Sequence, residues 1–333
     1  MKMRALYRLA SGLLALLLLS GCAPQERKYE ETWLDVFDTV TTLSGCETRE
    51  ASFRQTGREV HDALTEYHRL FDIYHDYGGI NNLKTVNDSA GVAPVPVDRR
   101  ILDLLKTCRE YDRLTDGKVN AAMGSVLSLW HDKREAGLQN PDTAALPDPA
   151  ALAEAAKHCS WDTVVLDEES STVYISDPHQ RIDVGSVAKG WAAEQIRALL
   201  PDGYLLSLGG NIVASGSKPD GSPWKVGVQD PDSGDQFIRI LELTGGSAVT
   251  SGDYQRYYTV NGTRYCHIID PDTGMPGTRY RSVTVLCENS ALADCLSTAL
   301  FLLPQEEGLA LASRCAAQAI WVLPDGTILS TPA

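Results

Sequence analysis

Tyr257-Tyr258-Thr259-Val260-Asn261-Gly262-Thr263-Arg264-Tyr265 is the stretch that decides the fold class. Its β-branched and aromatic residues flank an Asn-Gly pair, which predicts an antiparallel hairpin closed by a two-residue turn. The hairpin lies inside residues 203–286, and this whole stretch is predicted almost entirely as strands. The centre of the chain is therefore expected to form a sheet with antiparallel neighbours.

Helices are predicted on both sides of this strand-rich stretch. Residues 51–74 carry apolar side chains at helical spacing, and Asp98 caps a second helix that ends at Asp116-Gly117. Further helices are predicted over residues 150–158, 187–200, 290–303 and 305–315, and further strands over 33–43, 161–166, 172–176, 318–323 and 327–329. Residues 131–149 are charged and contain proline, so we expect a surface excursion there. Because helices and strands do not alternate steadily, the prediction is a single two-lobed α+β domain with mixed or antiparallel sheets and packed helices.

The N-terminal residues are predicted to form a bacterial lipoprotein signal peptide. A basic start precedes a Leu-rich run that is too short to span a bilayer, and Leu-Ser-Gly then leads directly into Cys22. We expect cleavage before Cys22 and lipids on its thiol; an ordinary cleaved signal peptide with an incidental cysteine is the alternative. The chain is thus divided into a signal peptide (1–21), a polar tether (22–32) and a folded domain (33–333). The mature protein would lie at the outer face of a bacterial cell membrane.

Charge and cysteine content exclude several classes of function. The 333-residue chain has a formal net charge of −14 and no basic run, which argues against binding to nucleic acid and against electrostatic docking on anionic lipid. Its 8 cysteines include no Cys-x-x-Cys pair, so a zinc site or a thioredoxin-like redox pair is not expected. Without Cys22 their number is odd, and at least one thiol therefore stays free or pairs outside the chain.

Four segments are too rich in glycine or polar residues to be ordinary core. They are residues 116–124, 182–190 and 207–211, and the pair 250–254 with 266–274. Backbone N–H groups at the start of the helix that follows Asp183 suit an anion, and Lys189 adds positive charge there. A helix cap without a ligand is the alternative for that segment. His267 is a candidate general base, and its alternative is a histidine that only completes local hydrogen bonds.

Asp294 and Thr298 are the candidate metal ligands. They lie four residues apart in the helix predicted over 290–303 and so share a face. A carboxylate and a hydroxyl on one face of an otherwise apolar helix suit a hard cation that prefers oxygen ligands. The alternative is an interaction of Asp294 with the helix dipole, together with a Thr298 hydroxyl that bonds back to its own turn.

Taken together and in this order, these segments resemble the FAD:protein FMN transferase family, the ApbE type of flavin transferase. The resemblance runs from about Val36 to Leu303 and rests on the segments quoted above, on Leu208 to Asn211, and on Asp294 with Thr298. Members of this family are often exported lipoproteins, which agrees with the interpretation of Cys22.

The resemblance implies a reaction. FAD binds with Mg²⁺, its pyrophosphate is cleaved, FMN passes to a Ser or Thr hydroxyl of a partner protein, and AMP leaves. Asp294 and Thr298 would hold Mg²⁺ together with the backbone carbonyl of Ser186, His267 would deprotonate the acceptor hydroxyl, and Asp270 could share that work. The positions that match FAD contacts of the family are Phe37, Tyr74, Lys118, Val119, Asn120, Asp183, Lys189 and Ile269. The partner is expected to be a flavoprotein with an exposed Thr or Ser, for example a subunit of a membrane redox complex.

The chain departs from the family pattern in ways that leave two other functions open. Asn120 stands where the family usually has Asp, Cys266 stands where Ser is more usual, and residues 75–82 are less regular than is typical. An FAD pyrophosphatase that releases free FMN and AMP is one alternative, and a flavin-binding lipoprotein without enzymatic activity is the other. The retained Asp294 and Thr298 speak against the binding protein, because simple binding needs no metal.

Overall fold

The computed structural model describes residues 26–234 and 236–332. The predicted signal peptide, Cys22 and the first residues of the tether therefore lie outside the described residues. Within the described part, every helix is too short or too polar to cross a membrane.

The largest element is an antiparallel sheet of eight strands in the order β1-β2-β6-β7-β10-β15-β16-β17. The strands are β1 (Arg27–Trp33), β2 (Thr41–Glu47), β6 (Tyr204–Leu208), β7 (Asn211–Ala214), β10 (Gly246–Gly252), β15 (Ser282–Cys287), β16 (Gln318–Val322) and β17 (Ile328–Ser330). Consecutive residues alternate between the two faces, so that Val249 enters the main core while Ala248 packs on the opposite side. Both faces are therefore buried against other elements.

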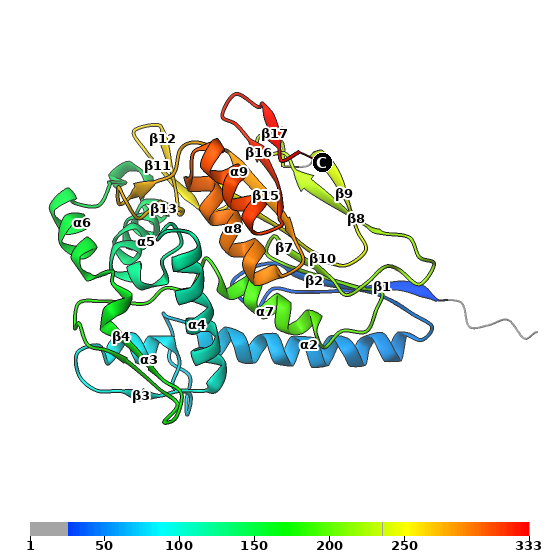
Figure 1. Ribbon diagram of the computed structural model, residues 1–333, viewed down its shortest axis with the longest axis horizontal. Helices are drawn as coiled ribbons and strands as arrows, with labels where there is room; N and C mark the ends of the chain where they lie inside the picture. The colour runs from blue at the N-terminus through cyan, green and yellow to red at the C-terminus, as the bar shows by residue number, and fades with distance from the viewer. Residues whose placement is uncertain (1–25, 235, 333) are drawn as a thin grey trace, which may run out of the picture.

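Helices cover one face of this sheet and a hairpin covers the other (Figure 1). The helices are α2 (Glu50–Phe71), α7 (Ala188–Arg197), α8 (Ser290–Leu302) and α9 (Gln305–Arg314). The hairpin of β8 (Trp224–Gln229) and β9 (Phe237–Leu243) packs its apolar side on the other face through Trp224 and Leu241. Helix α8 contacts β10, β15 and α7, which explains why almost all of its residues are buried.

The second lobe contains most of the remaining elements and lies at one end of the sheet (Figure 1). Its helices are α3 (Leu83–Asp88), α4 (Arg99–Leu114), α5 (Gly124–Gln139) and α6 (Pro149–Ala155), with short 3₁₀ turns at Ala121–Met123, Pro141–Thr143, Ala156–His158 and Trp161–Thr163. Its strands are β3 (Val95–Pro96), β4 (Val164–Asp167), β5 (Thr172–Ile175), β11 (Tyr257–Val260), β12 (Thr263–Cys266), β13 (Ile269–Asp270) and β14 (Met275–Pro276). The α+β class is thereby confirmed.

The hairpin that the Asn-Gly pair predicts is present. Tyr257 pairs with Cys266 and Val260 with Thr263, so the turn contains only Asn261 and Gly262. Their φ angles are 50° and 80°, the left-handed values that this two-residue turn requires at both positions. Asp98 also caps α4 as expected, because its side chain accepts a hydrogen bond from the Arg100 N–H.

Three expectations about secondary structure are wrong. Residues 33–43 do not form one strand, because Phe37 and Asp38 take φ angles of 55° and 50° and turn the chain between β1 and β2. Residues 27–32 of the expected polar tether are the outermost strand of the main sheet, since they pair with β2. The expected excursion at 131–149 is wrong over residues 131–139, which belong to α5. The charged residues around Lys133 lie on this helix, whose few buried positions do not give a clear apolar stripe.

Candidate active site

A cleft of about 860 Å³ is lined by residues from both lobes. It brings together every predicted site residue of the described chain except Asp270. The predicted residues that line it are Phe37, Tyr74, Lys118, Val119, Asn120, Asp183, Ser186, Lys189, His267, Ile269, Asp294 and Thr298. Residues more than two hundred positions apart in sequence thus meet in one cavity, which is large enough for a nucleotide-sized ligand.

Asp294 lies at the contact between α8 and the start of α7. Its carboxylate is almost completely buried and accepts a hydrogen bond from the Gly190 N–H at 2.8 Å. A Cβ atom on Gly190 would lie 2.4 Å from the Ser290 carbonyl oxygen and 2.5 Å from Asp294 Cβ, so only glycine permits this approach of the two helices. Burial raises the pKa of Asp294, and the ammonium of Lys189, 3.8 Å away, opposes that rise. A cation at this carboxylate would offset the cost of burying its charge.

Thr298 lies one turn after Asp294 on the same helix, and both line the cleft. The Thr298 hydroxyl makes no hydrogen bond with another described residue; the hydroxyl that bonds back to its turn is that of Ser297, which donates to the Asp294 carbonyl at 2.9 Å. The alternative explanation of Thr298 as a residue bonded to its own turn is therefore wrong. One carboxylate, one hydroxyl and nearby Ser186 match the needs of Mg²⁺, which takes few protein oxygens and completes its shell with phosphate and water. Within residues 26–234 and 236–332, no three His, Cys, Asp or Glu side chains gather to form a metal site of their own.

His267 presents a neutral imidazole to the cleft. Its Nδ1 lies 3.1 Å from the Arg256 carbonyl oxygen, which can only accept, so Nδ1 carries the proton and Nε2 keeps its lone pair. The surrounding protein, Arg256 and Lys189 together lower the pKa of His267 well below its ordinary value. The ring remains accessible from the cleft. At neutral pH the ring is therefore unprotonated, and the Nε2 lone pair faces the cleft without a proton on it, as a general base requires before the reaction.

Asp270 follows His267 closely in sequence but does not line the cleft. Its carboxylate pairs with the Lys118 ammonium at 2.8 Å, and the same ammonium contacts Asp272 at 2.7 Å. Asp270 Oδ1 also accepts from the Asp272 N–H at 3.1 Å and so shapes the turn between β13 and β14. The expectation that Asp270 shares proton transfer with His267 therefore has no support in the geometry. Asp270 instead holds Lys118, and with it the loop at 116–120, against the 266–274 segment.

Asn120 and Asp183 fix two further walls of the cleft. The Asn120 side chain accepts from the Ala122 N–H at 2.8 Å and donates to the Cys159 carbonyl at 2.9 Å, so both ends of the amide are in use. Asp183 accepts from the Gly185 N–H at 2.8 Å, which orders the turn that leads into α7. Burial raises the pKa of Asp183, and the hydrogen bond from Gly185 opposes that rise. Val119 and Ile269 are buried apolar residues of the same walls.

Aromatic side chains form the mouth of the cleft. The left-handed turn at Phe37 is held by a hydrogen bond from its N–H to His68 Nδ1 at 3.1 Å. Tyr74 is half exposed and stacks on His131 with ring centroids 4.7 Å apart. A flat aromatic ligand could take the place of such a stacking partner. The left-handed backbone conformation of Phe37 is strained for a residue other than glycine, and such strain is typical of loops at functional sites.

Sequence reasoning missed four basic side chains that line the cleft, namely His68, His131, Arg134 and Arg256. Arg134 reaches the cleft because residues 124–139 form a helix, and its guanidinium lies 3.0 Å from His131 Nδ1. Arg256 lies directly beyond the polar run at 250–254, so extending that segment by two residues would have included it. Lys189, Arg134 and Arg256 thus place three cationic side chains in the lining of the cleft, where a phosphorylated ligand would pair with them.

Comparisons with known proteins agree with this site. The model of the ApbE family matches residues 37–321. A FAD:protein FMN transferase of Treponema pallidum is 36% identical over 263 residues, which cover 73% of this chain and 71% of that protein. One of Klebsiella pneumoniae is 32% identical over 276 residues, covering 79% and 83%. The crystal structure of the ApbE protein of Thermotoga maritima superimposes with a TM-score of 0.81 at 28% identity, covering 92% of this chain and 97% of that one. These similarities span both lobes and show that the chain belongs to the ApbE family.

Proposed function

We propose that this protein is a Mg²⁺-dependent FAD:protein FMN transferase. The observation that carries the proposal is the meeting of a neutral imidazole, at His267, with the oxygen ligands Asp294 and Thr298 in one cation-lined cleft. A base and a site for a hard cation are what a hydroxyl needs to attack a pyrophosphate. The relatives named above carry the same activity in their names.

In the proposed reaction, the polar residues of the cleft have different roles. The acceptor Ser or Thr oxygen attacks the phosphorus of the FMN half, its proton passes to His267 Nε2, and the P–O bond to AMP breaks with its electron pair on the departing phosphate. Lys189 and Arg256 line the same cleft, and their charges would oppose that of the pyrophosphate. When bound at Asp294, Thr298 and the Ser186 carbonyl, Mg²⁺ supplies charge neutralisation on the phosphate oxygens. Asp183, Asn120 and the aromatic mouth position the FAD.

Water in place of the acceptor hydroxyl would turn the same cleft into an FAD pyrophosphatase. The observation that favours this second function is that His267 is accessible from the cleft, so water can reach it. A binding protein without activity is disfavoured, because flavin binding alone needs neither the His267–Arg256 arrangement nor a metal site.

We also propose that Cys22 carries the lipids that anchor the mature chain to the outer face of a bacterial cell membrane. The support for this is the signal-peptide sequence that precedes Cys22. Mass spectrometry of the protein from membranes would test it, since a lipidated Cys22 adds the mass of its acyl chains and a Cys22→Ala variant would be released.

The transfer itself is tested with protein that begins at Ala23, so that β1 stays whole. It is incubated with FAD, Mg²⁺ and an acceptor protein that has an exposed Thr, and the nucleotides and the intact acceptor mass are followed. One added FMN unit with release of AMP is expected. Free FMN and AMP, independent of the acceptor, would instead establish the pyrophosphatase, and unchanged FAD would refute both.

Asp294→Asn is the matched variant for the metal site. Asparagine keeps the size of the side chain and an oxygen to accept from the Gly190 N–H, so the fold should persist. The loss of the carboxylate charge should abolish Mg²⁺-dependent turnover. Full activity of a folded Asp294→Asn variant would remove this residue from the metal site.

A further inference from the structure

A second cavity, of about 520 Å³, shares Asn120 with the FAD cleft and is otherwise lined by different residues. It is formed by one face of α4, which contributes Arg109, Asp112 and Arg113, and by the segment around Trp161. Asn120 lines both cavities, so it is part of the wall between them. The proposed transfer reaction uses none of the α4 residues.

Two hydrogen-bond donors in the lining of this cavity are buried and have no acceptor. They are Arg109 Nε and Trp161 Nε1. The Arg109 guanidinium lies over the Trp161 ring, 5.2 Å from its centroid, and another of its nitrogens donates to the Val164 carbonyl. The two orphaned donors therefore belong to groups that touch each other. Buried donors are almost always paired in folded proteins, so two together indicate a missing acceptor.

Two arginines lie at the same place, and within the described chain neither is directly paired with a carboxylate. Arg109 and Arg113 are four residues apart on α4, where like charges repel. Neither forms an ion pair with a carboxylate of the described residues, although the chain has 44 acidic residues against 30 basic ones. Burial and the repulsion by Arg113 both lower the pKa of Arg109. Asp112 and Asp162 also line the cavity and would repel a highly charged polyanion.

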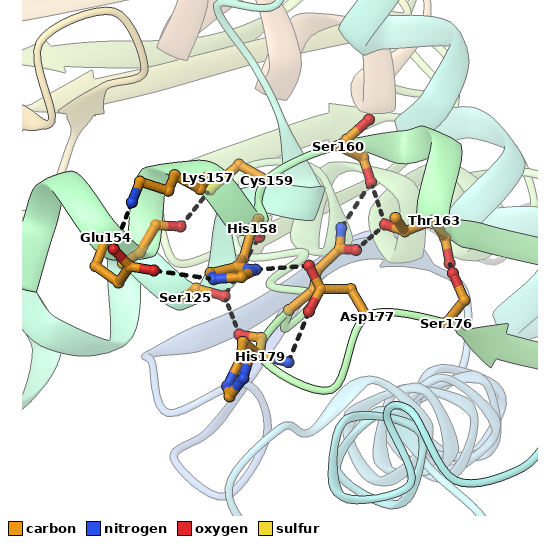
Figure 2. Close-up of polar contacts among 12 residues, drawn as sticks. Ser125, Glu154, Lys157, His158, Cys159, Ser160, Thr163, Ser176, Asp177 and His179 are labelled. Carbon is orange, nitrogen blue, oxygen red and sulfur yellow. Dashed lines mark hydrogen bonds and ion pairs between the residues drawn. The ribbon is translucent and has the colours of Figure 1, made fainter.

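The wall opposite α4 is held in place by its own hydrogen bonds, several of which Figure 2 shows. His158 Nδ1 contacts Asp177 at 2.6 Å, the Cys159 thiol donates to the Ala155 carbonyl at 3.4 Å, and the Thr163 hydroxyl donates to the Ser160 carbonyl at 2.8 Å. These bonds hold the chain on both sides of Trp161 without any ligand. Such preorganisation lowers the entropic cost of binding.

We propose that this cavity is a binding site for a small oxyanion, a carboxylate or a phosphate of low charge. Its oxygens would accept from Arg109 Nε and Trp161 Nε1, and its charge would be balanced by Arg109 and Arg113. The site is separate from the FAD cleft, and the proposal does not depend on the transferase activity.

The test measures the thermal unfolding midpoint and the binding isotherm of the protein with sodium acetate and with inorganic phosphate, at ionic strength held constant with sodium chloride. Saturable binding of at least one probe is expected, together with a rise in the midpoint that chloride does not cause. Binding of acetate alone would identify the ligand as a carboxylate, and binding of phosphate alone would identify it as a phosphate.

Two variants separate this site from the cations of the FAD cleft. Trp161→Phe keeps an aromatic ring beneath Arg109 and removes only the unpaired donor, and Arg113→Gln removes one exposed charge. Each should weaken binding about tenfold or more while the protein without probe unfolds at an unchanged or higher temperature. Arg58→Gln, which removes an exposed charge on α2, is the control and should bind as the unmodified protein does. Equal binding by Trp161→Phe and Arg113→Gln, or no saturable binding of either probe, would overturn the proposal.

Discussion

Gly190→Ala should damage the protein more than a single methyl group ordinarily does. The added Cβ would lie 2.4 Å from the Ser290 carbonyl oxygen and 2.5 Å from Asp294 Cβ, and both belong to a buried helix that has no room to move. Separating α7 from α8 also weakens the hydrogen bond from the Gly190 N–H to the Asp294 carboxylate. The substitution therefore acts on packing and on the proposed metal ligand, Asp294, together.

The magnitude follows from three contributions. Overpacking a close-packed contact costs about 1–3 kcal/mol. The weakened bond to a buried charged acceptor costs up to about 1.5–3 kcal/mol. Replacing glycine by alanine within a helix stabilises the helix by at most about 1 kcal/mol, which offsets part of these costs. The free energy of unfolding should therefore fall by about 1.5–5 kcal/mol, measured by urea denaturation, and the Mg²⁺ concentration required for activity should rise.

Gly308→Ala is the matched control for this prediction. Gly308 also lies within a helix, α9, but its added Cβ would meet only the ends of two side chains, Leu300 Cδ2 at 3.3 Å and Trp321 Cζ2 at 3.5 Å. The free energy of unfolding should stay unchanged or rise by up to about 1 kcal/mol. If Gly190→Ala were as stable as the unmodified protein, or if both variants lost the same stability, close approach of the backbones would not be the cause.

Three further predictions concern the site. Because its surroundings lower the pKa of His267, this residue stays unprotonated as the pH falls through about 6.5. The fall of kcat/KM on the acid side should therefore lie below about pH 6. If the fall were centred near pH 6.5 and disappeared in His267→Ala, this prediction would be contradicted. Asn120→Asp loses the donor to the Cys159 carbonyl and places a carboxylate oxygen against that carbonyl. The free energy of unfolding, measured by urea denaturation, should therefore fall by about 1–3 kcal/mol. An equally stable variant would be evidence against the two hydrogen bonds of the Asn120 amide. Asp270→Asn should destabilise the protein more than Asp272→Asn, because the side chain of Asp270 is 18% exposed and that of Asp272 is 72% exposed. If both variants lost the same free energy of unfolding, burial would not strengthen the ion pair with Lys118.

The fold class was predictable because its signals are local. Alternating apolar residues, the Asn-Gly turn at 261–262 and the Asp98 cap each act within a few residues, and the structure contains all of them. The errors arise where a local pattern competes with long-range pairing. Residues 27–32 are as polar as a linker, yet they form a strand because β2 offers an open edge. Nothing within that segment indicates its partner.

The predicted site residues converge for a related reason. Asp183 lies in a glycine-containing segment, His267 in a polar segment and Asp294 in an otherwise apolar helix. Polar groups in such places are costly to bury unless they serve a turn or a ligand. Arg134 carries no such signal, because a charged residue on a helix is ordinarily only a solvated one. Its place in the cleft depends on how α5 packs, which the local sequence does not reveal.

Asp270 shows that nearness in sequence does not establish a shared chemical role. It lies three positions after His267, but β13 begins between them and turns the carboxylate toward Lys118 instead of the cleft. That pairing ties the loop at 116–120, from one side of the cleft, to the turn at 270–274 on the other. A carboxylate that fixes a wall of the cleft must stay ionised and paired, and a carboxylate that moves protons must be free to exchange them. The Lys118 contact therefore supports a positioning role for Asp270, and the proposed proton acceptor is His267 alone.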